Sequence, residues 1–182
     1  MALLHNVRAI IPTRGDVDVR YIVEHLRSYA EIGHIQVCVG TTPWNRYQAA
    51  IDTPETSIYV QDDDCLTDLR PLLDAYIPGE CVMVNAMTQQ HQKNYNSRFT
   101  LIGFGAIFDR AMLAVFDGYE RDSLFYRESD RIMGSVPHRT VFPRIFISSD
   151  ALADNRTWRQ TGHNKARRLM EARIVQHGRN LI

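Results

Sequence analysis

Short β-branched apolar runs alternate along the chain with segments whose apolar residues recur at helical spacing. This alternation predicts an α/β domain in which helices flank a mostly parallel sheet. We expect strands at residues 7–12, 35–39, 57–60, 81–84, 99–108 and 140–147. We expect helices at residues 19–29, 66–76, 111–116, 123–134 and from 164 onward. The polar segments 41–56 and 87–98 are expected to form loops, the first with one helical turn near 47–51.

The chain of 182 residues has the composition of one globular domain, which we expect to span residues 1–182. Its 21 Lys and Arg balance its 21 Asp and Glu, yet residues 156–182 carry seven basic side chains and one acidic. This basic helical tail, with a net charge of +6, would attract a polyanion. Three cysteines without zinc-site spacing, no signal peptide and no membrane-spanning apolar run favour a cytoplasmic protein with no membrane partner.

The strand at 57–60 runs directly into three consecutive aspartates, Asp62, Asp63 and Asp64. In parallel sheets, ligands bind beyond the carboxyl ends of the strands, where these residues lie. If the strand alternation continues, Asp62 and Asp64 project to one side and Asp63 to the other. Adjacent carboxylates repel one another, so a divalent cation shared with phosphate oxygens is their natural partner. The alternative is a cap for the helix beginning near Leu66, but one aspartate is enough for a cap.

Four segments in this order resemble the GT-A glycosyltransferases over roughly residues 6–170. The triplet Asp62–Asp64 resembles the DxD motif of that superfamily and follows an opening strand that ends in the turn Ile11–Arg14. Gly103–Phe108 resembles the small-residue strand of that superfamily. Residues 128–130 resemble its acidic motif, and residues 162–164 resemble its histidine motif. The resemblance implies a single GT-A, Rossmann-like domain. It also implies transfer of a sugar from a nucleotide-diphosphate sugar, with a UDP-sugar as the expected donor.

The resemblance also implies roles for individual residues at the donor end of the site. Mn²⁺ or Mg²⁺ would be held by Asp64 with help from Asp62, and His163 would complete the metal shell. Asp63 would face the ribose or the donor sugar. As a Lewis acid, the metal would stabilise the charge that develops on the leaving diphosphate.

Further donor contacts come from both ends of the chain. The nucleotide pocket would be lined by Thr13, Arg14 and Asp16. The alternative is that these residues form a plain surface turn. The small-residue strand would place Gly105 beneath the donor. The basic tail contains Lys165, Arg167 and Arg168. One interpretation is that these residues bind the diphosphate, and the other is that they form a solvated helix face.

Asp130 is the expected catalytic carboxylate, because an acceptor hydroxyl becomes a good nucleophile only when its proton is removed. In an inverting reaction Asp130 would be the general base, and in a retaining one it would stabilise an oxocarbenium-like state. Residues 129–133 also resemble the acidic motif of the retaining exostosin-like branch, so both outcomes stay open. Glu128 would bind acceptor hydroxyls. Taken alone, residues 127–131 also fit a salt-bridged helix face.

The hydroxyl acceptor is open among a saccharide, a protein and a hydroxymethyl-pyrimidine of phage DNA. The compact chain resembles phage and bacterial glycosyltransferases, which would place it in bacterial or phage-infected host cytoplasm. One alternative function is a sugar-nucleotide nucleotidylyltransferase, although residues 11–16 are a poor version of the Gly-rich loop that reaction needs. The other alternative is a non-catalytic module that binds nucleotide sugars or metal.

Overall fold

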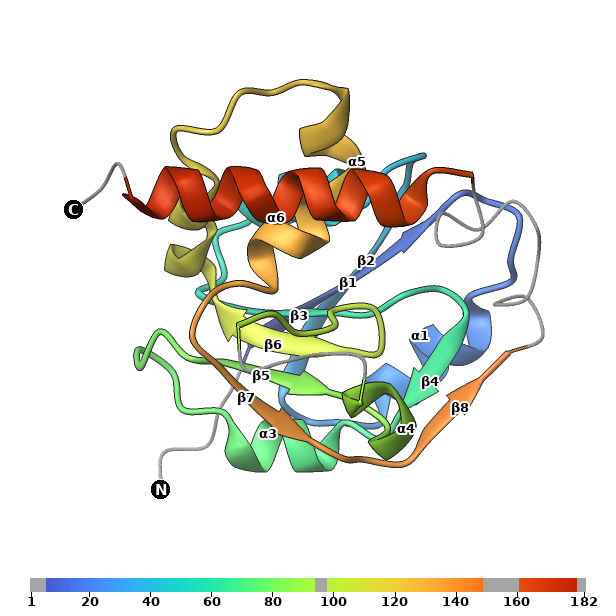
Figure 1. Ribbon diagram of the computed structural model, residues 1–182. Coiled ribbons are helices and arrows are strands. Elements are labelled where there is room, and N and C mark those ends of the chain that lie inside the picture. The colour runs from blue at the N-terminus through green and yellow to red at the C-terminus, as the bar shows by residue number, and fades with distance from the viewer. Residues whose placement is uncertain (1–5, 94–97, 149–160, 180–182) are drawn as a thin grey trace.

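The computed structural model describes residues 6–93, 98–148 and 161–179. Its main sheet has six strands in the order β2-β1-β3-β6-β5-β7 (Figure 1). The strands are β1 (Val7–Thr13), β2 (Ile32–Val39), β3 (Ser57–Val60), β5 (Met83–Ala86), β6 (Ala106–Asp109) and β7 (His138–Val141). All run in the same direction except β6, which is antiparallel to both of its neighbours. This sheet, flanked by helices in a single domain, confirms the expected α/β class and is consistent with a GT-A, Rossmann-like fold.

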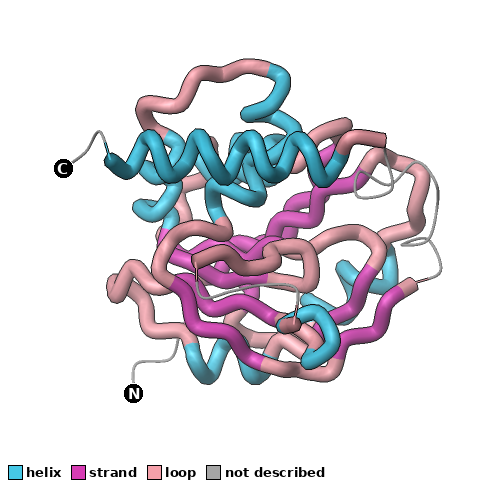
Figure 2. Tube along the Cα trace, viewed as in Figure 1, coloured by secondary structure: helices cyan, strands magenta, loops and turns pink. Residues whose placement is uncertain are grey.

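Helices cover both faces of the sheet, as Figures 1 and 2 show. One face carries α2 (Trp44–Ile51), the 3-10 helix η1 (Arg110–Phe116), α5 (Ser123–Met133) and α6 (His163–Arg179). The opposite face carries α1 (Arg20–Arg27) and α3 (Arg70–Ala75). Successive side chains of β3 supply both layers, because Ile58 and Val60 join the first core and Tyr59 joins the second. A one-turn helix, α4 (Gln89–Gln92), lies in the expected loop at 87–98.

Two short strands form a separate sheet and correct two expectations. β4 (Cys65–Thr67) pairs antiparallel with β8 (Ile145–Ile147), so residues 66–76 do not form one helix. Helix α3 begins only at Arg70, with proline in its first turn, a position that suits a residue without an N–H donor. Similarly, Pro143 separates β7 from β8 in the segment expected to form one interrupted strand.

Other boundaries shift where glycine or packing overrides the local pattern. Residues 41–56 contain a two-turn helix, α2, because Trp44 and Tyr47 are buried against the sheet. The strand expected at 99–108 is regular only from Ala106, since Gly105 has a φ of +125°, which a strand residue with a side chain would avoid. Within the described residues, no helix has both the length and the apolar composition needed to cross a membrane.

Helix α6 is tied to α5 by Asp122, which has two roles. Its carboxylate caps α5 by accepting a hydrogen bond from the backbone N–H of Phe125 at 2.8 Å. It also accepts two hydrogen bonds from the Arg173 guanidinium, at 3.0 and 2.7 Å. These bonds from Arg173 hold the pKa of Asp122 at about 2, below the ordinary value of 3.8. The described part of the expected basic tail is therefore docked on the domain rather than separate from it.

We expect Asp122→Asn to lower the free energy of unfolding by about 1 kcal/mol at pH 7, a magnitude reduced for solvent screening. The asparagine still caps the helix, so the change isolates the charge. Because the folded-state pKa is lowered, the stabilisation is complete above pH 4 and is lost as the pH falls through about 2. Urea unfolding of both proteins between pH 7 and pH 2 measures this difference.

Asp18→Asn is the matched control for this experiment. Asp18 also pairs with an arginine, Arg20, but both side chains are exposed and only two residues apart. Their pairing is local and screened by water, so its loss should change the unfolding midpoint much less than Asp122→Asn does. A difference between wild type and Asp122→Asn that stays constant down to pH 2 would contradict the assigned role of the charge.

Candidate functional site

A cavity of about 210 Å³ lies at the edge of the sheet where the parallel strands end. The segments that follow β1, β2 and β3 line it, which is the position that parallel sheets favour for ligands. Since β6 runs antiparallel to its neighbours, the segment at 100–103, which precedes it, reaches the same edge of the sheet. Helix α5 and the first turn of α6 complete the wall. The cavity therefore collects residues from widely separated parts of the sequence.

The acidic triplet lines this cavity with all three of its side chains. Strand β3 ends at Val60, so residues 62–64 leave the two-residue alternation and turn instead. Asp63, expected to project away from its neighbours, lines the same cavity and is 3% exposed. Asp62 and Asp64 are more exposed. Asp63 therefore differs from its two neighbours in burial, although all three residues line one cavity.

The carboxylate of Asp62 is held from two sides. Its Oδ1 accepts a hydrogen bond from Nη2 of Arg46 at 2.5 Å. Its Oδ2 lies beside Gly103, where an added Cβ would come within 2.2 Å of that oxygen. The backbone N–H of Asp62 donates to the carbonyl of Gly103 at 2.8 Å. The glycine noted in the sequence therefore packs against the first aspartate of the triplet.

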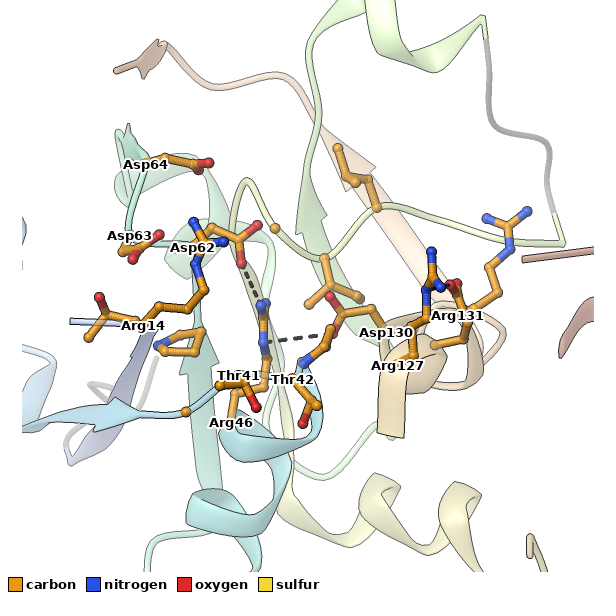
Figure 3. A pocket seen from close by; sticks show the side chains of 18 of the residues that line it. Arg14, Thr41, Thr42, Arg46, Asp62, Asp63, Asp64, Arg127, Asp130 and Arg131 are labelled. Carbon is orange, nitrogen blue, oxygen red and sulfur yellow. Dashed lines mark hydrogen bonds and ion pairs between the residues drawn. The ribbon is translucent and has the colours of Figure 1, made fainter. Parts of the chain in front are cut away.

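Arg46, on α2, lies between two carboxylates (Figure 3). Besides its bond to Asp62, its Nε is 3.7 Å from Oδ1 of Asp130. Its side chain is 4% exposed. Burial opposes the charge, but Asp130 and Asp62 more than offset that cost and raise the pKa of Arg46 above its ordinary value. Arg46 is therefore a permanent cation within the wall of the cavity.

Asp130, the expected catalytic carboxylate, lines the cavity from α5. The hydroxyl of Tyr47 donates to its Oδ1 at 2.6 Å. Burial raises the pKa of Tyr47 well above its ordinary value, so this group stays protonated as a donor. Burial likewise raises the pKa of Asp130 despite the neighbouring Arg46. The carboxylate is thus oriented by adjacent residues of one helix, Arg46 and Tyr47.

Glu128 lies at an irregularity in α5, where its φ of −113° and ψ of 21° leave the helical range. The residue is 4% exposed and lines the cavity. Burial raises the pKa of Glu128 to about 7, although three arginines nearby lower it. Its Oε1 is 3.5 Å from Nε of Arg127 and 3.8 Å from Nδ1 of His163. A salt-bridged surface face, the alternative for this segment, does not describe a buried carboxyl group.

Helix α6 presents two residues to the cavity, His163 and Arg167, which are one turn apart. Burial, with Arg167 and Arg127, lowers the pKa of His163 to about 4, so its imidazole is neutral at pH 7. Its contact with Glu128 is therefore not an ion pair. Lys165 and Arg168, expected at a diphosphate, are exposed and do not line the cavity. The helical period explains this, because a face that holds 163 and 167 turns 165 and 168 toward solvent.

The first strand delivers the remaining expected residues. Thr13 and Arg14 line the cavity, and Arg14 is paired with Asp16 at 3.2 Å. Asp16 itself is not among the lining residues. Gly105 also lies outside the lining, and a Cβ there would meet the hydroxyl of Tyr59 at 2.7 Å. Its absent side chain serves the packing of β6.

The donor set on the acidic side fits a divalent cation that keeps part of its shell for other ligands. Among residues 6–93, 98–148 and 161–179, no three carboxylate, imidazole or thiol groups form a cluster able to hold a metal. His163 contacts Glu128 instead of joining the triplet. Hard cations such as Mg²⁺ are commonly held by one or two carboxylates plus substrate phosphates and water. Asp64 and Asp62 can supply those carboxylates.

Sequence reasoning missed three arginines of the cavity, Arg46, Arg127 and Arg131. Arg46 lies in a segment expected to be mostly loop, although its aromatic neighbours at 44 and 47 signal a buried helix around a single charge. Arg127 and Arg131 are four residues apart and flank the acidic motif, a spacing that puts both on one helix face.

Comparisons with known proteins give structural matches only. No protein-family model and no curated protein matches the chain. Similar solved structures include A197 from STIV, with a TM-score of 0.52 and 11% identity over 78% of this chain and 85% of that one. They also include a mutant Drosophila β-1,4-galactosyltransferase 7 in complex with manganese, UDP-Gal and xylobiose, with a TM-score of 0.44 and 16% identity over 77% of this chain and 65% of that one. The similarity to A197 supports the fold, and neither identity establishes an activity.

Proposed function

We propose that this chain is a glycosyltransferase that moves a sugar from a nucleotide-diphosphate donor to a hydroxyl acceptor. One observation carries the proposal: buried polar atoms that make no hydrogen bond within the described residues gather around one cavity. They belong to five lining residues, Arg46, Thr100, Arg127, Glu128 and His163. Leaving buried donors and acceptors unpaired costs about 1–3 kcal/mol each, so such a set is built to meet a polar ligand.

The charges of the cavity suit the two halves of such a donor. Asp62, Asp63 and Asp64 form an acidic side that would share a divalent cation with phosphate oxygens. Arg127 and Arg167 face the same cavity from α5 and α6. The negative charge of a diphosphate between these sides would be compensated by the divalent cation on the acidic side and by the arginines on the other. When bound, Mn²⁺ or Mg²⁺ would act as a Lewis acid that stabilises the leaving diphosphate.

The protein's own groups account for the remaining roles. Asp130, oriented by Tyr47, would accept the proton of the attacking hydroxyl in an inverting reaction or stabilise positive charge at the sugar in a retaining one. Glu128 would bind a hydroxyl of the acceptor. Thr13 and Arg14, at the end of β1, would contact the nucleoside, and we take a UDP-sugar as the first donor to test.

The exposed surface of α6 favours a saccharide or protein acceptor over DNA. In its described part, Arg167 faces the cavity and Arg173 is bound to Asp122. Lys165 and Arg168 are the cations that remain on its exposed face at residues 163–178. Duplex binding relies on many phosphate contacts, and two exposed cations on this helix are a small footprint.

A thermal-shift panel of nucleotide sugars, each with Mn²⁺ and with EDTA, tests the proposal. A ligand at one hundred times its Kd stabilises the native state by about 2.7 kcal/mol, or about 5–10 °C for a chain of this size. We expect one class of donor to give such a shift with Mn²⁺ and a smaller one with EDTA. Donors that shift the protein are then assayed for slow release of free nucleotide, which a non-catalytic binding module would not produce.

The matched control is Asp74→Asn, which removes an exposed carboxylate on α3, on the opposite face of the sheet. It should leave every shift unchanged. If no nucleotide sugar stabilises the protein under either condition, the proposed function is wrong.

A further inference from the structure

Arg46 lies where two carboxylates from distant parts of the sequence face the cavity. Its guanidinium lies between Asp62, which comes from the acidic triplet, and Asp130, which comes from α5 (Figure 3). The Nη2–Oδ1 distance to Asp62 is 2.5 Å and the Nε–Oδ1 distance to Asp130 is 3.7 Å. The Arg46 side chain is 4% exposed, whereas those of Asp62 and Asp130 are 38% and 31% exposed, so water screens the two attractions only in part.

The hydrogen bonds of Arg46 are incomplete, which separates it from an ordinary structural ion pair. Its Nε and Nη1 are buried and make no hydrogen bond within the described residues. Both belong to a residue that lines the cavity. A buried arginine held only for stability would normally use its whole donor fork. A ligand oxygen that approaches this part of the wall would satisfy donors that are otherwise left unpaired.

We propose that Arg46 is the resident cation of this site, which neutralises Asp62 and Asp130 until a nucleotide binds. A divalent ion that arrives alone must compete with a fixed guanidinium for Asp62 and is repelled by its charge. A nucleotide diphosphate adds negative charge, provides oxygen ligands for the ion and offers acceptors to the free N–H groups of Arg46. Metal and diphosphate therefore bind together, and the metal alone binds weakly.

The inference rests on the proposed function for the identity of the diphosphate, but its central test uses Mn²⁺ alone. Binding of Mn²⁺ to the full chain is measured by electron paramagnetic resonance in the absence of nucleotide. For wild type we expect a Kd of roughly 1 mM or weaker, in the range of weak carboxylate sites. Arg46→Gln, which keeps a donor for Asp62 and removes the charge, should bind Mn²⁺ at least about 10-fold more tightly.

Two further variants make the comparison specific. Arg46→Lys keeps the charge and should stay within about 3-fold of wild type. Arg127→Gln removes a charge from the same cavity at a residue that contacts Glu128 instead of Asp62, so it should change Mn²⁺ affinity much less than Arg46→Gln. Circular dichroism establishes that each variant is folded before binding is measured.

Three outcomes would overturn the inference. They are a folded Arg46→Gln with wild-type Mn²⁺ affinity, an equal gain in Arg127→Gln, and tight Mn²⁺ binding by wild type without nucleotide. The last measurement needs no variant, so it decides the question even if the Arg46 variants do not fold. Failure of every nucleotide sugar to bind, with the Mn²⁺ results as expected, would instead remove the proposed function and leave intact only the competition between Arg46 and the metal for Asp62.

Discussion

Asp130→Asn is expected to lower kcat for sugar transfer by about 10²–10⁴-fold, with little change in the donor's KM. Asparagine matches aspartate in shape and its amide oxygen still accepts the hydrogen bond from Tyr47, but the amide cannot take a proton or carry a negative charge. Steady-state kinetics with the donor found in the thermal-shift panel measure the effect. Thermal unfolding of the variant checks that its fold is retained.

Glu128→Gln is the matched comparison, because it makes the same chemical change two residues away in the same helix and cavity. If Glu128 binds the acceptor, this variant should raise the acceptor's KM more than it lowers kcat. A reversal of the two profiles, with kcat lost in Glu128→Gln and retained in Asp130→Asn, would assign the catalytic carboxylate to Glu128.

Asp64→Asn is expected to abolish the part of the nucleotide-sugar thermal shift that depends on Mn²⁺. Asp62 is already bound to Arg46, and Asp64 is a partly exposed carboxylate that lines the cavity. An amide is a far poorer ligand for a hard cation than a carboxylate. The shift with Mn²⁺ should fall to the value seen with EDTA, and kcat should fall with it.

Asp74→Asn again serves as the control, because it removes one carboxylate far from the cavity. If Asp64→Asn keeps the full Mn²⁺-dependent shift, the metal is not held by this residue. The triplet would then be closer to the simple helix cap that is the alternative interpretation of the sequence.

The core sheet could be predicted because its signal is local. The runs at 7–12 and 57–60 are apolar and β-branched, and both are buried strands of the sheet. The segments whose structure was predicted wrongly depend on partners that are distant in the sequence. Nothing within residues 65–67 shows that they will pair with Ile145–Ile147. Tertiary pairing of this kind overrides the helical spacing of the leucines that follow.

The candidate site was predictable where one short motif follows one strand. Asp62–Asp64 and Thr13–Arg14 line the cavity, because strand direction alone fixes which edge of the sheet they occupy. Arg46 was not predictable in this way, since its importance comes from contacts with residues 16 and 84 positions away. The choice of Arg167 over its neighbours likewise needs the docking of α6, which the sequence pattern leaves open.

The docking of α6 has a consequence for synthesis of the protein. The cavity combines Thr13, at the end of the first strand, with His163 and Arg167, in the last helix. On the ribosome, the sheet and α5 emerge before α6 does. A nascent chain can therefore assemble its core early, but it acquires the complete wall of the pocket only when α6 leaves the exit tunnel and packs against α5.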